Sequence, residues 1–156
     1  MNVFLTFLLG FFVQRDSFDR YLEKMTRDFS VPQTQTISSD STYILIDTRE
    51  KEEFDVSHIQ GARNIPYASF NLESMSDISK KSMIVVYCSV GYRSNKIAEK
   101  LMEAGYTNVQ NLYGGIFKWV NDGENIYSDK GKTDTLHVYN FLWGRYVFNT
   151  DVKKVY

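Results

Sequence analysis

Cysteine is almost absent from this chain of 156 residues. The single cysteine, Cys88, excludes an internal disulfide framework and any zinc or iron–sulfur site built from several cysteines. Because the sequence also contains only two histidines, we expect no metal ion. A lone thiol is compatible with oxidising and reducing compartments, so it does not identify the location of the protein.

An excess of charge of either sign is missing too. The chain contains 18 lysines and arginines and 19 aspartates and glutamates, which gives a net charge of −1 at pH 7. Nucleic acids and acidic membrane surfaces attract strongly basic proteins, so this balance predicts neither as a partner. The length suits one domain with short appendages, and the function must therefore reside in a specific site.

An apolar run long enough to cross a membrane is also lacking. Residues 1–13 are nearly all apolar, but a membrane-spanning helix needs about 20 such residues. Residues 1–14 therefore have three open interpretations: a secretory signal, a helix docked on the domain, or an anchor on a membrane surface. A signal would place the protein in the periplasm or cell envelope, and otherwise we expect it in the cytoplasm. A membrane is a partner only if this segment is an anchor.

An amphipathic helix is predicted for residues 15–30. Apolar side chains recur there at helical spacing, and charged residues occupy the other face. The apolar residues are Phe18, Tyr21, Leu22, Met25 and Phe29. We expect this apolar stripe to pack on the domain that follows.

A strand, a short loop and a helix are predicted for the stretch that contains the cysteine. Residues 83–87 are apolar and rich in β-branched side chains, which predicts a buried strand. Residues 97–104 have apolar side chains at helical spacing, and Gly105 is a suitable helix stop. The intervening loop therefore lies at a helix N-terminus, where free backbone N–H groups stabilise an anion.

The residues of this loop suit a nucleophilic cysteine. The helix N-terminus favours the thiolate form of Cys88, and Arg93 adds a permanent cation. Gly91 can adopt a positive φ angle, which lets successive N–H groups point toward an anion. A buried structural thiol is the alternative for Cys88.

The pattern Cys-x-x-Gly-x-Arg-Ser at residues 88–94 resembles the active-site loop of rhodanese-like sulfurtransferases. Further blocks similar to that family occur in order on both sides of the loop. They are residues 44–49 with 53–54, residues 57–66, residues 105–106, and residues 112–116 with Trp119. These blocks fit one domain at residues 31–127. The resemblance implies an α/β fold with three layers, a central and mainly parallel sheet flanked by helices, and the cysteine loop at the carboxyl end of a middle strand.

The resemblance also implies a reaction. The Cys88 thiolate attacks the sulfane sulfur of a small donor such as thiosulfate, and the resulting persulfide passes its outer sulfur to a thiol or cyanide. A protein thiol is a further candidate acceptor. Arg93 is expected to bind the donor together with the rest of the loop. The loop residues are Ser89, Val90, Gly91, Tyr92 and Ser94, of which Val90 and Tyr92 at the rim would shape acceptor choice. No cofactor is implied.

Two other classes of protein remain as alternatives. A non-enzymatic sulfur carrier or interaction module would have the same site in its sequence. A phosphatase or arsenate reductase also uses a cysteine in an anion-binding loop. Dual-specificity phosphatases, however, have one more residue between the cysteine and the arginine than the four of Ser89 to Tyr92.

Three residues upstream are expected to support the site. Asp47, at a strand end, should accept hydrogen bonds from loop N–H groups, and Arg49 should pair with Glu53 or another nearby acid. His58 invites the role of general base, but we expect it to fix a turn by hydrogen bonds. The sequence departs from the family at residues 37–43, which are too few for the helix that usually precedes this strand.

The remaining segments have weaker patterns. Residues 31–37 and 64–66 predict short strands, residues 70–78 a helical segment, residues 109–112 a strand, and residues 116–120 a helix with Trp119 buried. Residues 128–156 form a C-terminal extension, with a polar linker up to residue 134 and then an aromatic segment. The pattern does not decide between helix and strand in this segment, but its aromatic residues are expected to pack against the domain.

Overall fold

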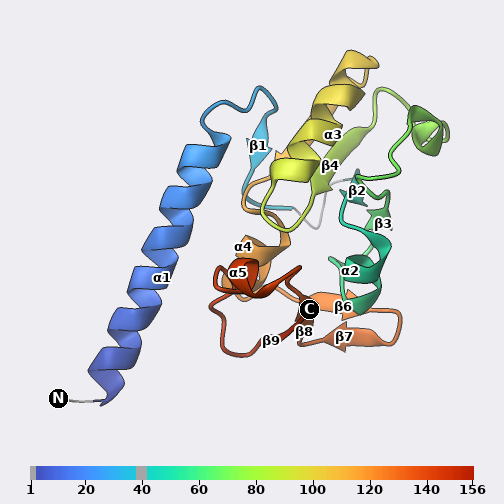
Figure 1. Cartoon of the computed structure of the whole chain (residues 1–156). Coiled ribbons are helices and arrows are strands. Elements are labelled where there is room, and N and C mark those ends of the chain that lie inside the picture. The colour runs from blue at the N-terminus through green and yellow to red at the C-terminus, as the bar shows by residue number, and fades with distance from the viewer. Residues whose placement is uncertain (1–2, 38–41) are drawn as a thin grey trace.

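A five-stranded parallel sheet forms the centre of the protein (Figure 1). The computed structural model describes residues 3–37 and 42–156, and only the backbone of residues 3–9 and 11. The strand order is β1-β5-β4-β2-β3. The strands are β1 (Gln33–Thr34), β2 (Tyr43–Asp47), β3 (Arg63–Asn64), β4 (Met83–Tyr87) and β5 (Asn108–Leu112). The predicted α/β fold is confirmed, with β4 as the middle strand.

Both faces of β4 are buried. Because successive side chains of a strand point to opposite faces, Ile84 and Val86 face one layer, and Val85 and Tyr87 face the other. Helix α3 (Tyr92–Glu103) covers the first face, where Leu101 packs in one cluster with Ile84 and Val86. This alternation accounts for the uninterrupted apolar sequence of the strand, as in other parallel sheets.

The second face of the sheet is covered by α4 (Gly115–Asn121) and part of α1 (Val3–Thr26), and α2 (Lys51–Val56) follows β2 in the chain. In α4, Ile116 and Phe117 are completely buried against Val85 and Tyr87. The prediction that Trp119 is buried was wrong, because its ring lies at the edge of the cluster and is only half-buried.

Helix α1 is continuous from Val3 to Thr26, so no break separates the two N-terminal segments expected from the sequence. Its C-terminal half packs on the domain through Phe18 and Leu22, as the amphipathic pattern predicted. Its N-terminal half extends away from the domain (Figure 1), and Phe12 and Val13 are 60% and 63% exposed. The docked-helix interpretation of residues 1–14 therefore gains no support from the side chains that the structure describes. Within the described residues, no helix is both long and apolar enough to cross a membrane.

The segments that flank the central strands agree with the sequence in outline. No helix lies between β1 and β2 in the described residues, although residues 38–41 of the predicted polar turn fall outside them. The helical pattern of residues 70–78 corresponds to a single 3-10 turn, η1 (Leu72–Met75). The expected strand at residues 64–66 begins earlier and ends at Asn64.

The C-terminal extension is folded from its start. The predicted polar linker is instead part of an antiparallel hairpin of β6 (Ile126–Ser128) and β7 (Gly131–Thr133). Strands β8 (Thr135–His137) and β9 (Lys153–Val155) form a separate parallel pair, and α5 (Phe141–Gly144) lies between them in sequence. The aromatic segment therefore contains both helix and strand.

An aromatic cluster joins the C-terminal extension to α1. The ring of Phe18 stacks on Tyr146 with centroids 5.1 Å apart and meets Phe148 edge-on at 6.4 Å. Tyr21 also stacks on Tyr146 at 5.1 Å and lies 5.8 Å from Trp143. The expectation that the aromatic residues pack against the rest of the protein is confirmed for Trp143, Tyr146 and Phe148, whereas Tyr139 and Phe141 are exposed.

We expect Phe18→Ala to lower the free energy of unfolding by about 3–5 kcal/mol, because it removes a buried ring and leaves a cavity. Val13→Ala is the matched control in the same helix, and its exposed side chain predicts a change within about 0.5 kcal/mol. Urea unfolding of both variants measures these values. Equal losses would contradict the assignment of only one half of α1 to the core.

Candidate functional site

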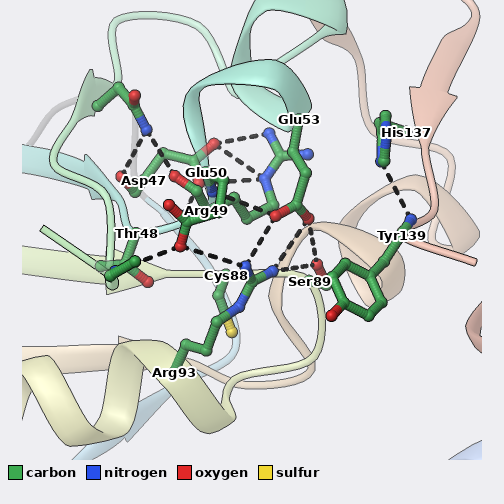
Figure 2. Close-up of polar contacts among 12 residues, drawn as sticks. Asp47, Thr48, Arg49, Glu50, Glu53, Cys88, Ser89, Arg93, His137 and Tyr139 are labelled. Atoms are coloured by element: carbon green, nitrogen blue, oxygen red, sulfur yellow. Dashed lines mark hydrogen bonds and ion pairs between the residues drawn. The ribbon is translucent and has the colours of Figure 1, made fainter. Parts of the chain in front are cut away.

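Cys88 lies at the carboxyl end of β4, where the chain turns into α3 (Figure 2). Its side chain is buried, with 1% of the residue exposed. Two backbone N–H groups in the first turn of α4 bind the loop. The Ile116 N–H donates to the Cys88 carbonyl at 2.9 Å, and the Phe117 N–H donates to the Ser89 carbonyl at 3.0 Å. The cysteine is therefore fixed at the junction of two strand-to-helix turns.

A glycine pair lets these two turns approach each other. Gly115 has φ +56°, and a Cβ atom at this position would overlap the carbonyl oxygens of Cys88 and Ser89. Gly114, with φ +74°, is the N-cap residue of α4. This close backbone contact explains why a side chain is absent at Gly115.

Gly91 places a backbone donor on the sulfur. Its φ angle of +106° is in the left-handed region, as predicted, and its N–H donates to Cys88 Sγ at 3.2 Å. Gly91 is also the N-cap residue of α3. The Asn111 side-chain amide donates to the Gly91 carbonyl at 3.0 Å and so fixes the turn. The positive end of a helix and one directed N–H group therefore face the cysteine sulfur.

The guanidinium of Arg93 is bound by two side chains. Its Nη1 and Nη2 atoms contact the two carboxylate oxygens of Glu53 at 2.7 and 3.0 Å, and Nη2 donates to Ser89 Oγ at 3.0 Å. The Ser89 hydroxyl in turn donates to Glu53 Oε1 at 3.1 Å. The predicted binding of a donor by Arg93 stays a prediction, and it requires the guanidinium to share or exchange these partners.

Glu53 is a buried carboxylate held in its charged form. Burial raises its pKa, but the hydrogen bonds and charge of Arg93 outweigh burial, and its pKa lies below the usual range. Burial lowers the pKa of Arg93, but Glu53 and the charge of Cys88 outweigh this effect and raise it above its usual value. The Glu50 N–H also donates to Glu53 Oε2 at 3.1 Å, which closes a capping box at the start of α2.

Asp47 and Arg49 form a second, fully buried ion pair. Arg49 Nη2 contacts Asp47 Oδ2 at 2.6 Å and donates to the Ser57 carbonyl at 2.6 Å, and the Arg49 N–H donates to Asp47 Oδ1 at 2.9 Å. These contacts join the end of β2 to the turn after α2, which agrees with the expected supporting role. Arg49 was expected to pair with Glu53 or another nearby acid. It pairs with Asp47, and Glu53 pairs with Arg93 instead.

His58 also has structural contacts. Its Nδ1 lies 3.0 Å from the Phe54 carbonyl, so this nitrogen is the protonated one, and its ring stacks on Phe54 at 3.9 Å. Its backbone forms an isolated bridge with Tyr127 at the start of the C-terminal extension. The predicted function in fixing a turn agrees with these contacts.

The other loop residues differ in position. Tyr92 is 51% exposed at the rim, whereas the expected rim position of Val90 was wrong. Val90 is 6% exposed because it packs in the cluster that contains Phe18. The Ser94 hydroxyl is buried and has no hydrogen-bond partner among the described residues.

Sequence reasoning missed three contributions from outside the loop. Glu53 is the partner of Arg93, and the capping-box spacing of Glu50 and Glu53 was a usable signal for its position. Tyr139, in the C-terminal extension, has its ring 6.0 Å from Arg93 Cζ. Met25 of α1 lies next to Gly91. The sequence contains no signal for the last two, because both depend on the packing of distant segments.

Comparisons with known proteins give consistent matches. The model of the rhodanese-like domain matches residues 30–122. A sulfurtransferase of Allochromatium vinosum is 33% identical over 98 residues, which are 63% of this chain and 91% of that protein. The adenylyltransferase and sulfurtransferase UBA4 of Meyerozyma guilliermondii is 37% identical over 90 residues, but they are 53% of this chain and only 21% of that protein. The BH2092 protein of Bacillus halodurans has the same fold, with a TM-score of 0.57, 24% identity, and coverage of 72% of this chain and 87% of that chain.

Glu53→Gln should lower the free energy of unfolding by about 1.5–3 kcal/mol at pH 7, because the amide cannot replace a charge-assisted pair. The folded-state pKa of Glu53 is lowered, so its contribution is complete above the unfolded value of about 4.3 and is lost as the pH falls through the folded value. The difference between wild type and variant should therefore shrink in acid. Urea unfolding between pH 7 and pH 3 measures it, with the exposed Glu52→Gln as control. A difference that is independent of pH would contradict the ion-pair explanation.

Proposed function

The chain belongs to the family of rhodanese-like domains, and from this premise we propose that it transfers sulfur through a persulfide on Cys88. Relatives in the comparison are named as sulfurtransferases, which supports this general activity. The observation that supports the role of Cys88 most directly is the Gly91 N–H directed at its sulfur at 3.2 Å. A structural thiol needs no such donor, whereas a thiolate or persulfide anion is stabilised by it.

The proposed reaction has two steps. In the first, the Cys88 thiolate attacks the sulfane sulfur of thiosulfate, the S–S bond of the donor breaks, and sulfite leaves with the bonding electron pair. In the second, a thiolate or cyanide attacks the outer sulfur of the persulfide, and the electron pair of the broken S–S bond returns to Cys88. No net oxidation occurs in either step.

Negative charge develops at the loop in both steps. The N–H groups of residues 89–94 and the N-terminus of α3 can stabilise this charge without rearrangement, because Gly91 and the first turn of α4 fix the loop. We assign Arg93 a role in donor binding, in which the sulfonate competes with Glu53 for the guanidinium.

The alternatives differ in their support. A phosphatase or arsenate reductase is disfavoured, because dual-specificity phosphatases have one more residue between the cysteine and the arginine than the four of Ser89 to Tyr92. A sulfur carrier without turnover would use the same persulfide. Turnover with a defined donor and acceptor distinguishes the carrier from the enzyme.

Incubation with excess thiosulfate should add one sulfur atom to the protein, and cyanide or a small thiol should remove it. Intact-mass spectrometry detects both events. Cys88→Ser is the matched control, since the chain has no other cysteine. A mass gain that persists in this variant, or no gain in wild type, would refute the persulfide. The same preparation should not hydrolyse an aryl phosphate.

Arg93→Ala should lower kcat/KM for thiosulfate by about 10- to 150-fold, which corresponds to the roughly 1.5–3 kcal/mol of a charge-assisted hydrogen bond. Glu53→Gln should lower kcat/KM less than Arg93→Ala does, because the guanidinium is still present and no longer has to exchange the Glu53 carboxylate for the donor. Steady-state kinetics of the two single variants and the double variant measure the coupling. If all three lose the same activity, Arg93 acts only by holding the loop through Glu53.

A further inference from the structure

Tyr139 is the only non-glycine residue with a positive φ angle among the described residues, at +66°. It lies between β8 and α5, at the centre of a three-residue turn closed by the Asn140 N–H, which donates to the Val138 carbonyl at 2.7 Å. Its own N–H donates to His137 Nδ1 at 3.1 Å (Figure 2). Val138 is completely buried, and Asn140 caps α5 through the Trp143 N–H. The turn is therefore fixed on both sides.

This turn directs the tyrosine ring toward the cysteine loop. The ring centroid lies 6.0 Å from Arg93 Cζ, within the range of a cation–π contact. Figure 2 shows the ring facing the guanidinium that Glu53 and Ser89 bind. The C-terminal extension thus supplies a side chain to the rim of the site from outside the matched residues 30–122.

Packing within the fold does not account for a tyrosine at this position. The residue is 57% exposed, so the ring gains little from burial. A left-handed backbone is unfavourable for an aromatic residue, and glycine would adopt it without strain. Such outliers cluster at functional sites, where the side chain rather than the backbone determines the residue.

The chemistry of the rim indicates which substrate would contact this ring. Tyr139 lies beside a cation that Glu53 already neutralises, and Tyr92, which immediately precedes Arg93 in the sequence, is also 51% exposed. Cyanide and inorganic anions gain nothing from aromatic surface. A thiol attached to a peptide gains contact area, and tyrosine offers such area at a low cost in rotamer entropy.

We propose that Tyr139 binds the sulfur acceptor, and that this acceptor is a thiol attached to a peptide. The proposal rests on the proposed persulfide function of Cys88. In the step concerned, the acceptor thiolate attacks the outer sulfur of the persulfide, and a new S–S bond forms on the acceptor. The old S–S bond breaks with its electron pair on Cys88, so the products are a peptide persulfide and the free cysteine thiolate.

Tyr139→Gly tests this proposal, with glutathione as the peptide thiol and cyanide as the acceptor without a peptide. Thiosulfate should load Cys88 of the variant as in wild type, and kcat/KM for cyanide should stay within about twofold. KM for glutathione should rise about 5- to 10-fold with little change in kcat, since up to about 1.4 kcal/mol of binding is lost. The unfolding temperature should be unchanged or higher, because glycine relieves the left-handed backbone.

Two further variants define the result. Tyr139→Phe keeps the ring and should behave as wild type. Phe141→Ala removes a ring that is 78% exposed in the same extension, and it should change neither acceptor. Wild type that is not loaded by thiosulfate would refute the persulfide function and the Tyr139 proposal with it. Normal loading combined with equal losses for both acceptors, no loss for glutathione, or a lower unfolding temperature of Tyr139→Gly would refute the Tyr139 proposal alone.

Discussion

Close backbone contact between two strand-to-helix turns is the constraint on which the site depends. The turn after β5 lies directly against the turn after β4, so that two N–H groups of α4 bind the carbonyls of Cys88 and Ser89. Only glycine fits at Gly115, because a Cβ atom would overlap those carbonyls. Parallel pairing of β4 with β5 brings both turns to the same edge of the sheet. The cysteine loop thus keeps its shape through the backbone, which leaves its own N–H groups free to face an anion.

The ion pair between Arg93 and Glu53 adds a second constraint, of electrostatic origin. Burying a carboxylate is costly, and the pair is tolerated because the remaining lone pairs of Glu53 are also bonded, by Ser89 and by the Glu50 N–H. The pair ties the start of α3 to α2 across the cysteine loop. Because the guanidinium already has a partner, any anion that binds to it must compete with Glu53.

Local sequence patterns predicted the parts of the structure that local chemistry determines. The strand at residues 83–87, the helix that ends before Gly105, and the left-handed Gly91 follow from periodicity and turn chemistry. Tertiary pairing was not predictable in the same way, because the partner of Arg93 and the burial of Val90 depend on residues distant in sequence. Short aromatic segments such as residues 137–148 fit helix and strand patterns equally well, so only packing decides between them.

The two appended segments share the environment of the cysteine loop, although neither belongs to the matched domain. Tyr21 of α1 stacks on Tyr146 of the extension, and burial raises its pKa, with further contributions from the charges of Tyr146 and Cys88. Its hydroxyl lies 3.5 Å from the sulfur of Met25, which in turn lies next to Gly91. Helix α1 and the extension therefore add side chains to the surroundings of the cysteine loop from outside the residues that the family model matches.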